Sequence, residues 1–329
     1  MSVVLAVDGG GYKTDVALVS GDGSLLAFVR GPHSSPHQIG VGGCLELLEQ
    51  LVGEARGRAE LGRDGGPVAD VGHVMMAGVD FPREEEELQR AVDGRGWAGR
   101  LTVANDTFAI LRAGTERGWG VALVCGAGMN CVGVGPGGEH VRYPALGAIT
   151  GDWGGGFDVG LAGLSAAARS ADGRGPATAL ERVVPGHFGL DTPMEVAEAI
   201  QLDGLDRRRI GELAPVVLGA AREDDVATGI AERLVSEAIA FLRATLERLE
   251  LTGEPVDVVL GGGLFQGDGA WLVRQVAGRL AAIAPEARVS QVDAAPVVGA
   301  ALLGLDDLEA PATAKERARR ELAEAAARG

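Results

Sequence analysis

Three glycine-rich segments and two short acidic motifs are the parts of this chain whose residue types could carry chemistry. The first segment, residues 8–15, reads DGGGYKTD and places a carboxylate between an apolar run and three glycines. Backbone N–H groups can converge on an anion where no Cβ blocks the approach, so this turn is a candidate phosphate loop. Asp8 is a candidate Mg²⁺ ligand because that cation prefers carboxylate oxygens, and Lys13 could offset phosphate charge. Taken alone, the segment fits an ordinary glycine hairpin equally well.

Two further glycine runs lie in the second half of the chain. Residues 126–130 read GAGMN and stand between two strand-like runs, as residues 8–15 do in the first half. Two glycine turns at equivalent places could together clamp a polyphosphate. Residues 259–265 read VLGGGLF, and triple glycine after an apolar strand would let a flat adenosine ring lie against the backbone. By itself, this third run fits a tight strand-to-helix turn better.

The acidic motifs are VAND at 103–106 and GDWGGG at 151–156. Asp106 follows a short apolar run and opens a predicted helix, where it could accept a proton from an attacking hydroxyl. An N-cap is the alternative for Asp106 and for Asn105, because both residue types are favoured at that position. Asp152 stands in a flexible glycine-rich segment and is a candidate ligand contact. Its neighbour Trp153 fits simple packing as well as ligand contact.

These residues need a scaffold, and the apolar pattern predicts a similar scaffold twice. Each half reads as three strands in a meander followed by alternating helix and strand. In the first half we predict strands at residues 3–7, 15–19, 25–29, 71–79 and 101–104 and helices at 43–60, 84–92 and 107–117. In the second half we predict strands at 121–125, 131–134, 140–143, 256–260 and 288–292 and helices at 226–251, 271–283 and 296–305, with a helical insertion at 160–225. Residues 313–328 are expected to form a frayed or peripheral helix.

Length and composition narrow the class of protein. The chain has 329 residues, which is enough for two domains, and a formal net charge of −16. Such an acidic surface repels phosphate backbones and anionic lipids, so nucleic acid and membrane partners are not expected. The uncharged stretch 118–138 is interrupted by glycines and reads as two strands instead of a membrane span. Three cysteines without paired spacing and the lack of a visible signal peptide favour the reducing cytoplasm.

In their order along the chain, DGGGYKTD, VAND, GAGMNC, GDWGGG and VVLGGGLF resemble the N-acetylglucosamine kinase and BadF/BadG/BcrA/BcrD ATPase family. That family belongs to the sugar kinase, heat-shock chaperone and actin superfamily. The resemblance covers about residues 3–305 and implies an α/β fold with two RNase H-like lobes of the actin/hexokinase type. It also implies ATP and Mg²⁺ in an interlobe cleft. The expected lobes are residues 1–117 and 118–305, with 306–329 as a charged Ala-rich tail and the last helix before it able to pack back on the first lobe.

The resemblance also implies a role for each motif residue. Asp106 would be the catalytic base, and Asp8 the metal-binding carboxylate. His37, in the loop 34–40 that closes over the sugar in this family, would contact substrate. The other substrate contacts would be Asn105, Asp106, Asn130 and Asp152. The ATP contacts would be Gly9, Gly10, Gly11, Tyr12, Lys13, Thr14, Gly126, Ala127, Gly128, Gly261, Gly262 and Gly263.

The chain departs from the family pattern at several of these positions. Tyr12 stands where the family commonly has Thr or Ser. Ala127 and Met129 replace both hydroxyl side chains of the second loop, so only backbone donors remain in that loop. Trp153 stands where the family frequently has an acidic residue. This difference allows the preferred substrate to be a sugar other than N-acetylglucosamine. The implied activity is phosphorylation of a small-molecule amino sugar, on the 6-hydroxyl of N-acetylglucosamine or a related hexosamine. The family often dimerises, so a homodimer is a further expectation.

Two other functions are compatible with the resemblance. The first is an ATPase activator of a radical dehydratase or reductase, which would need cysteines placed to bind an iron–sulfur cluster. The second is a non-catalytic sensor of sugar or nucleotide that kept the fold. Asp8 and Asp106 together favour catalysis over the sensor.

Overall fold

A computed structural model describes residues 1–61, 66–266 and 269–328. The chain forms two compact units, of which the first combines Met1–Ala122 with Val292–Gly329 and the second is Leu123–Gln291. None of the helices in the described part of the chain is both long enough and apolar enough to cross a membrane. The two units are described separately below.

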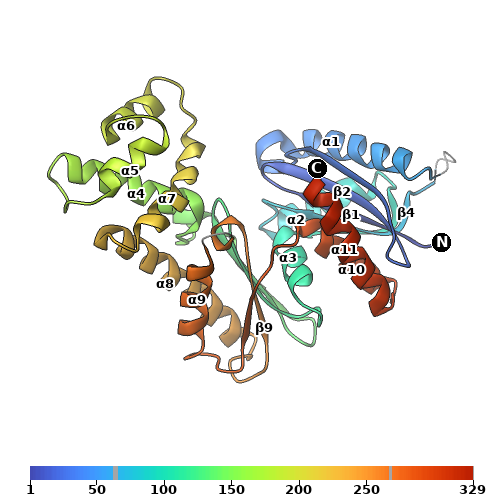
Figure 1. Ribbon diagram of the computed structural model, residues 1–329. Helices are drawn as coiled ribbons and strands as arrows, with labels where there is room; N and C mark the ends of the chain where they lie inside the picture. The colour runs from blue at the N-terminus through green and yellow to red at the C-terminus, as the bar shows by residue number, and fades with distance from the viewer. Residues whose placement is uncertain (62–65, 267–268, 329) are drawn as a thin grey trace. The chain divides into compact units, whose positions relative to one another are not determined.

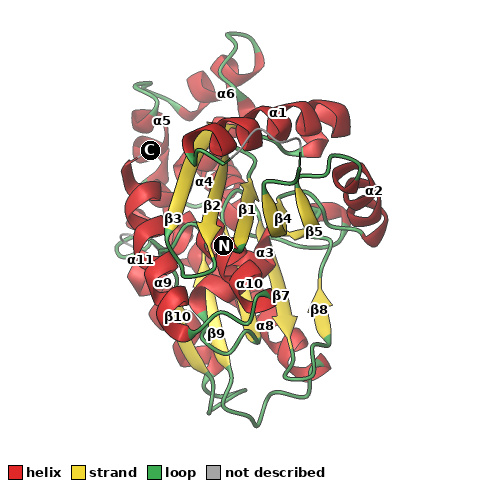
Figure 2. Ribbon diagram, turned by 90° about the vertical axis from the view of Figure 1, so that its right-hand side faces the viewer, coloured by secondary structure: helices red, strands yellow, loops and turns green. Residues whose placement is uncertain are grey.

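The first unit is built on a five-stranded mixed sheet in the order β3-β2-β1-β4-β5. Its strands are β1 (Val3–Gly9), β2 (Lys13–Ser20), β3 (Leu25–Pro32), β4 (Ala69–Met76) and β5 (Ala98–Asn105). The first three strands form the predicted antiparallel meander, and β4 and β5 run parallel to β1. The chain therefore leaves β1, β4 and β5 at the same edge of the sheet (Figure 2).

Helices cover both faces of this sheet, which explains why its central strand is apolar on both sides. Leu5 and Val7 of β1 pack on one face, whereas Val4 and Ala6 pack on the other, as the two-residue period of a strand requires. The first face is covered by α1 (Pro36–Arg58) and α2 (Pro82–Asp93). The second face is covered by α3 (Asp106–Gly114), α10 (Pro296–Asp307) and α11 (Ala312–Arg328) (Figure 1).

The second unit repeats this architecture. Its sheet has the order β10-β9-β6-β7-β8, so counting strands along the unit gives the same sequence of neighbours as in the first unit. The strands are β6 (Gly120–Cys125), β7 (Met129–Val134), β8 (His140–Arg142), β9 (Asp257–Gly261) and β10 (Arg288–Gln291). The helices are α4 (Gly155–Ala171), α5 (Leu180–His187), α6 (Pro193–Gln201), α7 (Ala214–Ala220), α8 (Asp225–Arg248) and α9 (Ala270–Leu280), and short 3₁₀ turns are η1 (Gly147–Ile149), η2 (Arg207–Leu213) and η3 (Gly263–Phe265). The predicted duplication and the α/β class are confirmed, and helices α4 to α7 lie between β8 and α8.

Two segments differ from their expectation. The loop expected at 34–40 is mostly the start of α1, because Pro36 suits a first-turn position, and only Gly40, with φ of 72°, interrupts the helix. The C-terminal helix α11 is not peripheral, since Ala318 and Leu322 are fully buried in the core of the first unit. The small alanine side chains of α11 let it pack closely against the rest of the first unit. The many charged residues in this segment made it look solvent-exposed in the sequence.

Candidate active site

The register of the parallel strands gathers the acidic motifs of the first unit. Gly9 at the end of β1 pairs with Met76 at the end of β4, and Met76 pairs with Asn105 at the end of β5. Open α/β sheets bind their ligands at the carboxyl ends of such strands. The glycine turn after Asp8, the loop after β4 and the start of α3 at Asp106 therefore share one edge of the sheet.

Asp8 carries a buried carboxylate in an unfavourable electrostatic position. The side chain is 5% exposed, and burial, followed by the negative charges of Asp106 and Asp15, raises its pKa from 3.8 to about 8. The cations of Lys13 and Arg30 oppose this shift only in part. A positive charge beside Asp8 would stabilise its ionised form.

Lys13 does not stand alone as a phosphate-binding cation. Its Nζ lies 2.6 Å from Oδ2 of Asp15, and the Nε of Arg30 lies 2.6 Å from the other oxygen of that carboxylate. Asp15 is fully buried, so the two cations hold its charge inside the protein. Arg30 is distant from Asp15 in the sequence, and only the β2–β3 pairing brings the two together, so this ion pair could not be predicted from the motif alone.

The glycine turn after β1 is closed by a hydrogen bond from Gly10 N to Lys13 O of 2.9 Å. A Cβ on Gly9 would overlap the side chains of Met76 and Ser34, so a larger residue there would displace both side chains. Gly11 is partly exposed, and Tyr12 projects into solvent with 80% of its surface exposed.

The hydroxyl of Thr14 faces the interior of the first unit. It lies 2.7 Å from the carbonyl oxygen of Pro32 and 2.8 Å from Oγ of Ser34, and the residue has no exposed surface. The Thr14 hydroxyl is therefore used in hydrogen bonds inside the protein, so the ATP contact expected at Thr14 would have to come from its backbone.

Asp106 is the first residue of α3, and the residue that caps this helix is Asn105. The Asn105 Oδ1 accepts from the backbone N–H of Thr107 at 3.0 Å. Asp106 as a whole residue is partly exposed, but its carboxyl group is surrounded by protein atoms. This burial raises its pKa to about 6 against the opposing effect of the Thr107 and Asp106 N–H groups. A carboxylate with a raised pKa suits a general base at neutral pH better than an ordinary aspartate.

His37 lies at the start of α1 and is paired with α2. Its Nε2 is 2.7 Å from Oε1 of Glu84, and its side chain is 49% exposed. The other Glu84 oxygen accepts from the backbone N–H groups of Asp80 and Phe81 at 3.0 and 2.9 Å. Glu84 therefore joins three segments: the start of α1, the loop after β4 and the first turn of α2.

The second unit holds the other glycine turn against the start of α4. The N–H of Gly156 donates to Gly126 O at 2.7 Å, and the N–H of Phe157 donates to Ala127 O at 3.1 Å. A Cβ on Gly155 would overlap the backbone of Gly128, so the two glycine-rich segments approach as closely as backbones can. This contact fixes the direction of the GAG turn.

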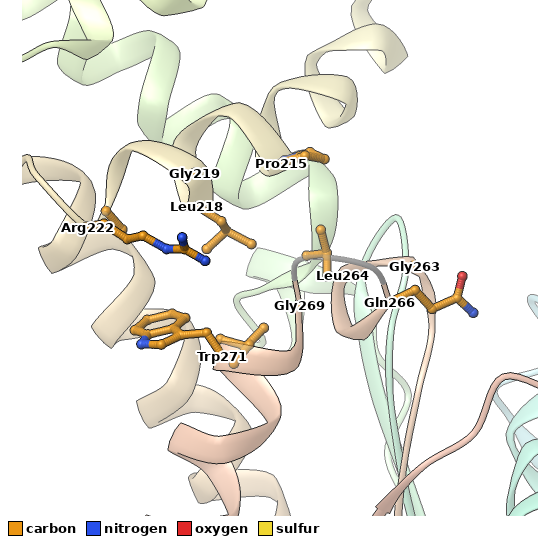
Figure 3. A pocket seen from close by; sticks show the side chains of 11 residues that line it. Pro215, Leu218, Gly219, Arg222, Gly263, Leu264, Gln266, Gly269 and Trp271 are labelled. Atoms are coloured by element: carbon orange, nitrogen blue, oxygen red, sulfur yellow. The ribbon is translucent and has the colours of Figure 1, made fainter.

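A cavity of roughly 430 Å³ lies in the second unit beside the third glycine run. Figure 3 shows Leu218 and Arg222 on one side of it and Trp271 on the other. The lining residues are Pro215, Leu218, Gly219, Ala221, Arg222, Gly263, Leu264, Gln266, Gly269, Trp271 and Leu272. Gly263 is the one expected ATP contact among them. Gly262, with φ of 96°, packs on the carbonyl of Cys125, and Gly261 is buried at the end of β9.

The residues expected on the sugar side of the second unit are partly exposed. Asp152 Oδ2 accepts from Thr150 Oγ1 at 2.6 Å, and Asn130 Oδ1 accepts from the N–H of Cys131 at 2.8 Å. The ring of Trp153 is covered by the guanidinium of Arg233, whose carbon lies 4.1 Å from the ring centroid. The acid-to-Trp departure thus brings an arginine to this segment through a cation–π contact.

The family resemblance implies that ATP is used together with Mg²⁺. In this chain, a single carboxylate, Asp8, could hold the ion. The described ranges contain no group of three or more His, Cys, Asp or Glu that could hold a metal by themselves. Mg²⁺ bound to a nucleotide keeps several waters and needs only one or two carboxylates. Asp8 meets that requirement because its buried carboxylate lies in the negative field of Asp106 and Asp15.

Comparison with known proteins identifies the family of this chain and several of its relatives. An N-acetylmuramic acid/N-acetylglucosamine kinase of Clostridium acetobutylicum is 27% identical over 276 residues, 80% of this chain and 86% of the relative. An N-acetyl-D-glucosamine kinase of Dictyostelium discoideum is 24% identical over 92% of this chain and 98% of the relative. A Chromobacterium violaceum structure solved under the name N-acetylglucosamine kinase has a TM-score of 0.70 at 26% identity, covering 92% and 99% of the two chains. Residues 5–304 match the BadF/BadG/BcrA/BcrD ATPase family, and the chain belongs to that family.

Proposed function

We propose that this protein is an ATP-dependent kinase that phosphorylates the 6-hydroxyl of N-acetylglucosamine or a related hexosamine. The observation that carries the proposal is the Asp106 carboxylate, which has a pKa of about 6 and stands at the carboxyl edge of the first sheet. The names of both curated relatives, which span 80% and 92% of this chain, are those of amino sugar kinases.

On the acceptor side, Asp106 takes the proton of the attacking hydroxyl. Phosphoryl transfer requires positioning and charge stabilisation more than covalent chemistry, so one correctly placed base suffices. Because α3 is capped by Asn105, the Asp106 side chain is not needed to cap the helix. A base on the first turn of a packed helix keeps its position through the reaction.

On the nucleotide side, the cavity beside Gly263 takes the adenosine. It has the size and the mainly apolar lining of a nucleotide-base site, with Trp271 as a flat surface and Arg222 as a polar group at its wall. In each unit the glycine turn, at 9–11 in the first and at 126–128 in the second, offers backbone donors for phosphate. Mg²⁺ held at Asp8 through water would neutralise phosphate charge when bound.

The iron–sulfur activator is not favoured by the cysteines of this chain. Cys44, Cys125 and Cys131 are free and fully buried. Burial raises their thiol pKa values to about 11, 12 and 12, which disfavours the thiolate that a cluster needs. The non-catalytic sensor is separated from the kinase by turnover alone.

The setting of the enzyme is also part of the proposal. Buried free thiols and an acidic surface fit a reducing cytoplasm. We assign Asp106 as a sugar contact of the first unit. For the second unit, Asn130 and Asp152 are our candidate sugar contacts, and we expect a homodimer. Sedimentation of the purified protein measures the last point.

A panel of acceptors tests the activity directly. ADP release with Mg²⁺ and ATP is measured for N-acetylglucosamine, N-acetylmuramic acid, N-acetylmannosamine, glucosamine and glucose, and the product is mapped by NMR. Sugar-dependent turnover with the phosphate on O6 is expected for at least one amino sugar. Asp106→Asn must abolish most of it, whereas Glu86→Gln, an exposed charge neutralisation on α2, must not. ATP hydrolysis that no sugar stimulates would overturn the proposal.

A further inference from the structure

Asp80 is an acidic residue beside the catalytic edge to which no role has been given. It lies in the loop that follows β4, and β4 is the parallel neighbour of the strand that ends at Asn105. The side chain is partly exposed. Neighbouring parallel strands deliver the residues after their carboxyl ends to the same place, so Asp80 belongs to the same sheet edge as Asp106.

Asn105 joins the two acids and is fully engaged in doing so. Its Nδ2 donates to Asp80 Oδ1 at 2.9 Å and to Val79 O at 3.2 Å. Its Oδ1 accepts from the N–H and the hydroxyl of Thr107 at 3.0 and 2.6 Å. A side-chain amide has two N–H donors and two acceptor lone pairs, so all four are used within the protein. Asn105, which is 4% exposed, therefore has no hydrogen-bonding group left for a substrate.

The backbone that carries Asp80 is held in place from its other side. The N–H groups of Asp80 and Phe81 both donate to Glu84, whose side chain turns back from the first turn of α2. Gly78, with φ of 78°, adopts the left-handed conformation that lets the chain turn directly after β4. A side chain fixed on both sides in this way is pre-organised for hydrogen bonding.

We propose that Asp80 accepts a hydrogen bond from a sugar hydroxyl other than the one that Asp106 deprotonates, and that Asn105 is its positioning residue. Asp80 has a further interaction within the protein besides the bond from Asn105. A carboxylate has two oxygens with about four acceptor sites, so it can accept a sugar hydroxyl in addition to bonds of this kind. This inference rests on the proposed kinase function. The sequence predicted a substrate contact at Asn105. We assign that contact to Asp80 instead, the acid that Asn105 orients.

Asp80→Asn tests the contact with little change of shape. The asparagine can still accept from Asn105 through its oxygen, but it presents an N–H₂ group where the carboxylate presented an acceptor. KM for the sugar should rise about 10- to 100-fold, the usual cost of a hydrogen bond to a charged group. KM for ATP should stay within about twofold, and Glu86→Gln on the exposed face of α2 serves as the matched control.

Deoxy sugars identify the hydroxyl concerned. The 3-deoxy and 4-deoxy analogues of the accepted sugar are compared in wild type and in Asp80→Asn. For the wild-type enzyme, one analogue should have a much lower kcat/KM than the parent sugar. In Asp80→Asn this difference should disappear, because the missing hydroxyl has no partner in the variant. Asn105→Asp keeps the helix cap but removes the donor to Asp80, and it should raise the sugar KM in the same direction.

The outcomes separate this inference from the proposed function. If wild type phosphorylates an amino sugar but Asp80→Asn keeps its sugar KM and both deoxy penalties, Asp80 does not contact the sugar. If Asp80→Asn has a lower melting temperature and its kcat and both KM values worsen together, the role of Asp80 is structural. If wild type phosphorylates no sugar at all, the kinase assignment itself fails, whatever the variants show.

Discussion

Replacement of Asp106 by asparagine is the most informative single change in this protein. The side chain keeps its shape but cannot accept a proton, and the cap of α3 is untouched because it belongs to Asn105. General base catalysis typically contributes 10²- to 10⁴-fold, so kcat should fall by about that factor. Nucleotide affinity should be preserved, since neither glycine turn nor the cavity of the second unit is altered.

The pH dependence of the wild-type enzyme gives a second measure of the same group. A base must be ionised to act, and the pKa of Asp106 is raised to about 6 by burial. We therefore expect kcat/KM for the sugar to fall on the acid side of about pH 6. Bound Mg²⁺ would favour the ionised form and move this limb to lower pH. The residual activity of Asp106→Asn should lack the limb.

As the pH rises, the free energy of unfolding should fall while the activity rises. The folded state binds the Asp106 proton more tightly than the unfolded state, so the free energy of unfolding falls as pH rises from about 4 to about 6. A shift from 3.8 to about 6 corresponds to at most ~3 kcal/mol for the ionised group. Asp106→Asn removes this cost. Its melting temperature should exceed that of wild type at pH 7.5 and approach it at pH 4.

Three measurements on one preparation decide the case: kcat, nucleotide affinity and melting temperature against pH. Wild-type kcat in Asp106→Asn would refute the assignment of the base. A kcat loss accompanied by a lower melting temperature at pH 7.5 would refute the electrostatic reasoning, because it would show that the carboxylate stabilises the fold.

Three further predictions concern the metal, the sugar and the nucleotide. Asp8→Asn should raise the Mg²⁺ concentration for half-maximal activity by about tenfold or more, and unchanged activity at limiting Mg²⁺ would contradict the assignment. Trp153→Glu restores an acid beside Arg233 and should change the ratios of kcat/KM among hexosamines, whereas unchanged ratios with a lower melting temperature would indicate a packing role. Trp271→Ala removes an aromatic wall of the cavity and should raise KM for ATP about 2- to 10-fold without affecting KM for the sugar, as measured by paired titrations.

The sequence predicted the scaffold well because the central strands of both sheets, β1 and β6, are buried along almost their whole length. A strand such as β1 is then an uninterrupted apolar run, and the glycine turns that follow β1 and β6 mark where each strand ends. The helices were located to within a few residues except at α1, where Pro36 begins the helix seven residues before the apolar period becomes regular.

Site chemistry was less accessible, because it depends on contacts between distant segments. Asn105 and Asp106 are adjacent and both can cap a helix, so only the structure shows that Asn105 does so. Asp80 was not singled out because its link to Asn105 spans 25 residues and exists only through the parallel pairing of two strands. The cavity was missed for the same reason, since Leu218 in the insertion and Trp271 after β9 meet only in three dimensions.

The way α10 and α11 complete the first unit has a consequence for how the protein is made. The second unit is one continuous stretch, Leu123–Gln291, and it can fold while the chain is still being synthesised. The sheet of the first unit, by contrast, has an apolar face that α3 covers only in part until residues 296–328 leave the ribosome. At synthesis rates of about 5–20 residues per second, that face stays partly exposed for some ten seconds or more. Nascent chains should therefore recruit chaperones during this interval, and the acid edge that carries Asp106 should become functional only after translation of α11.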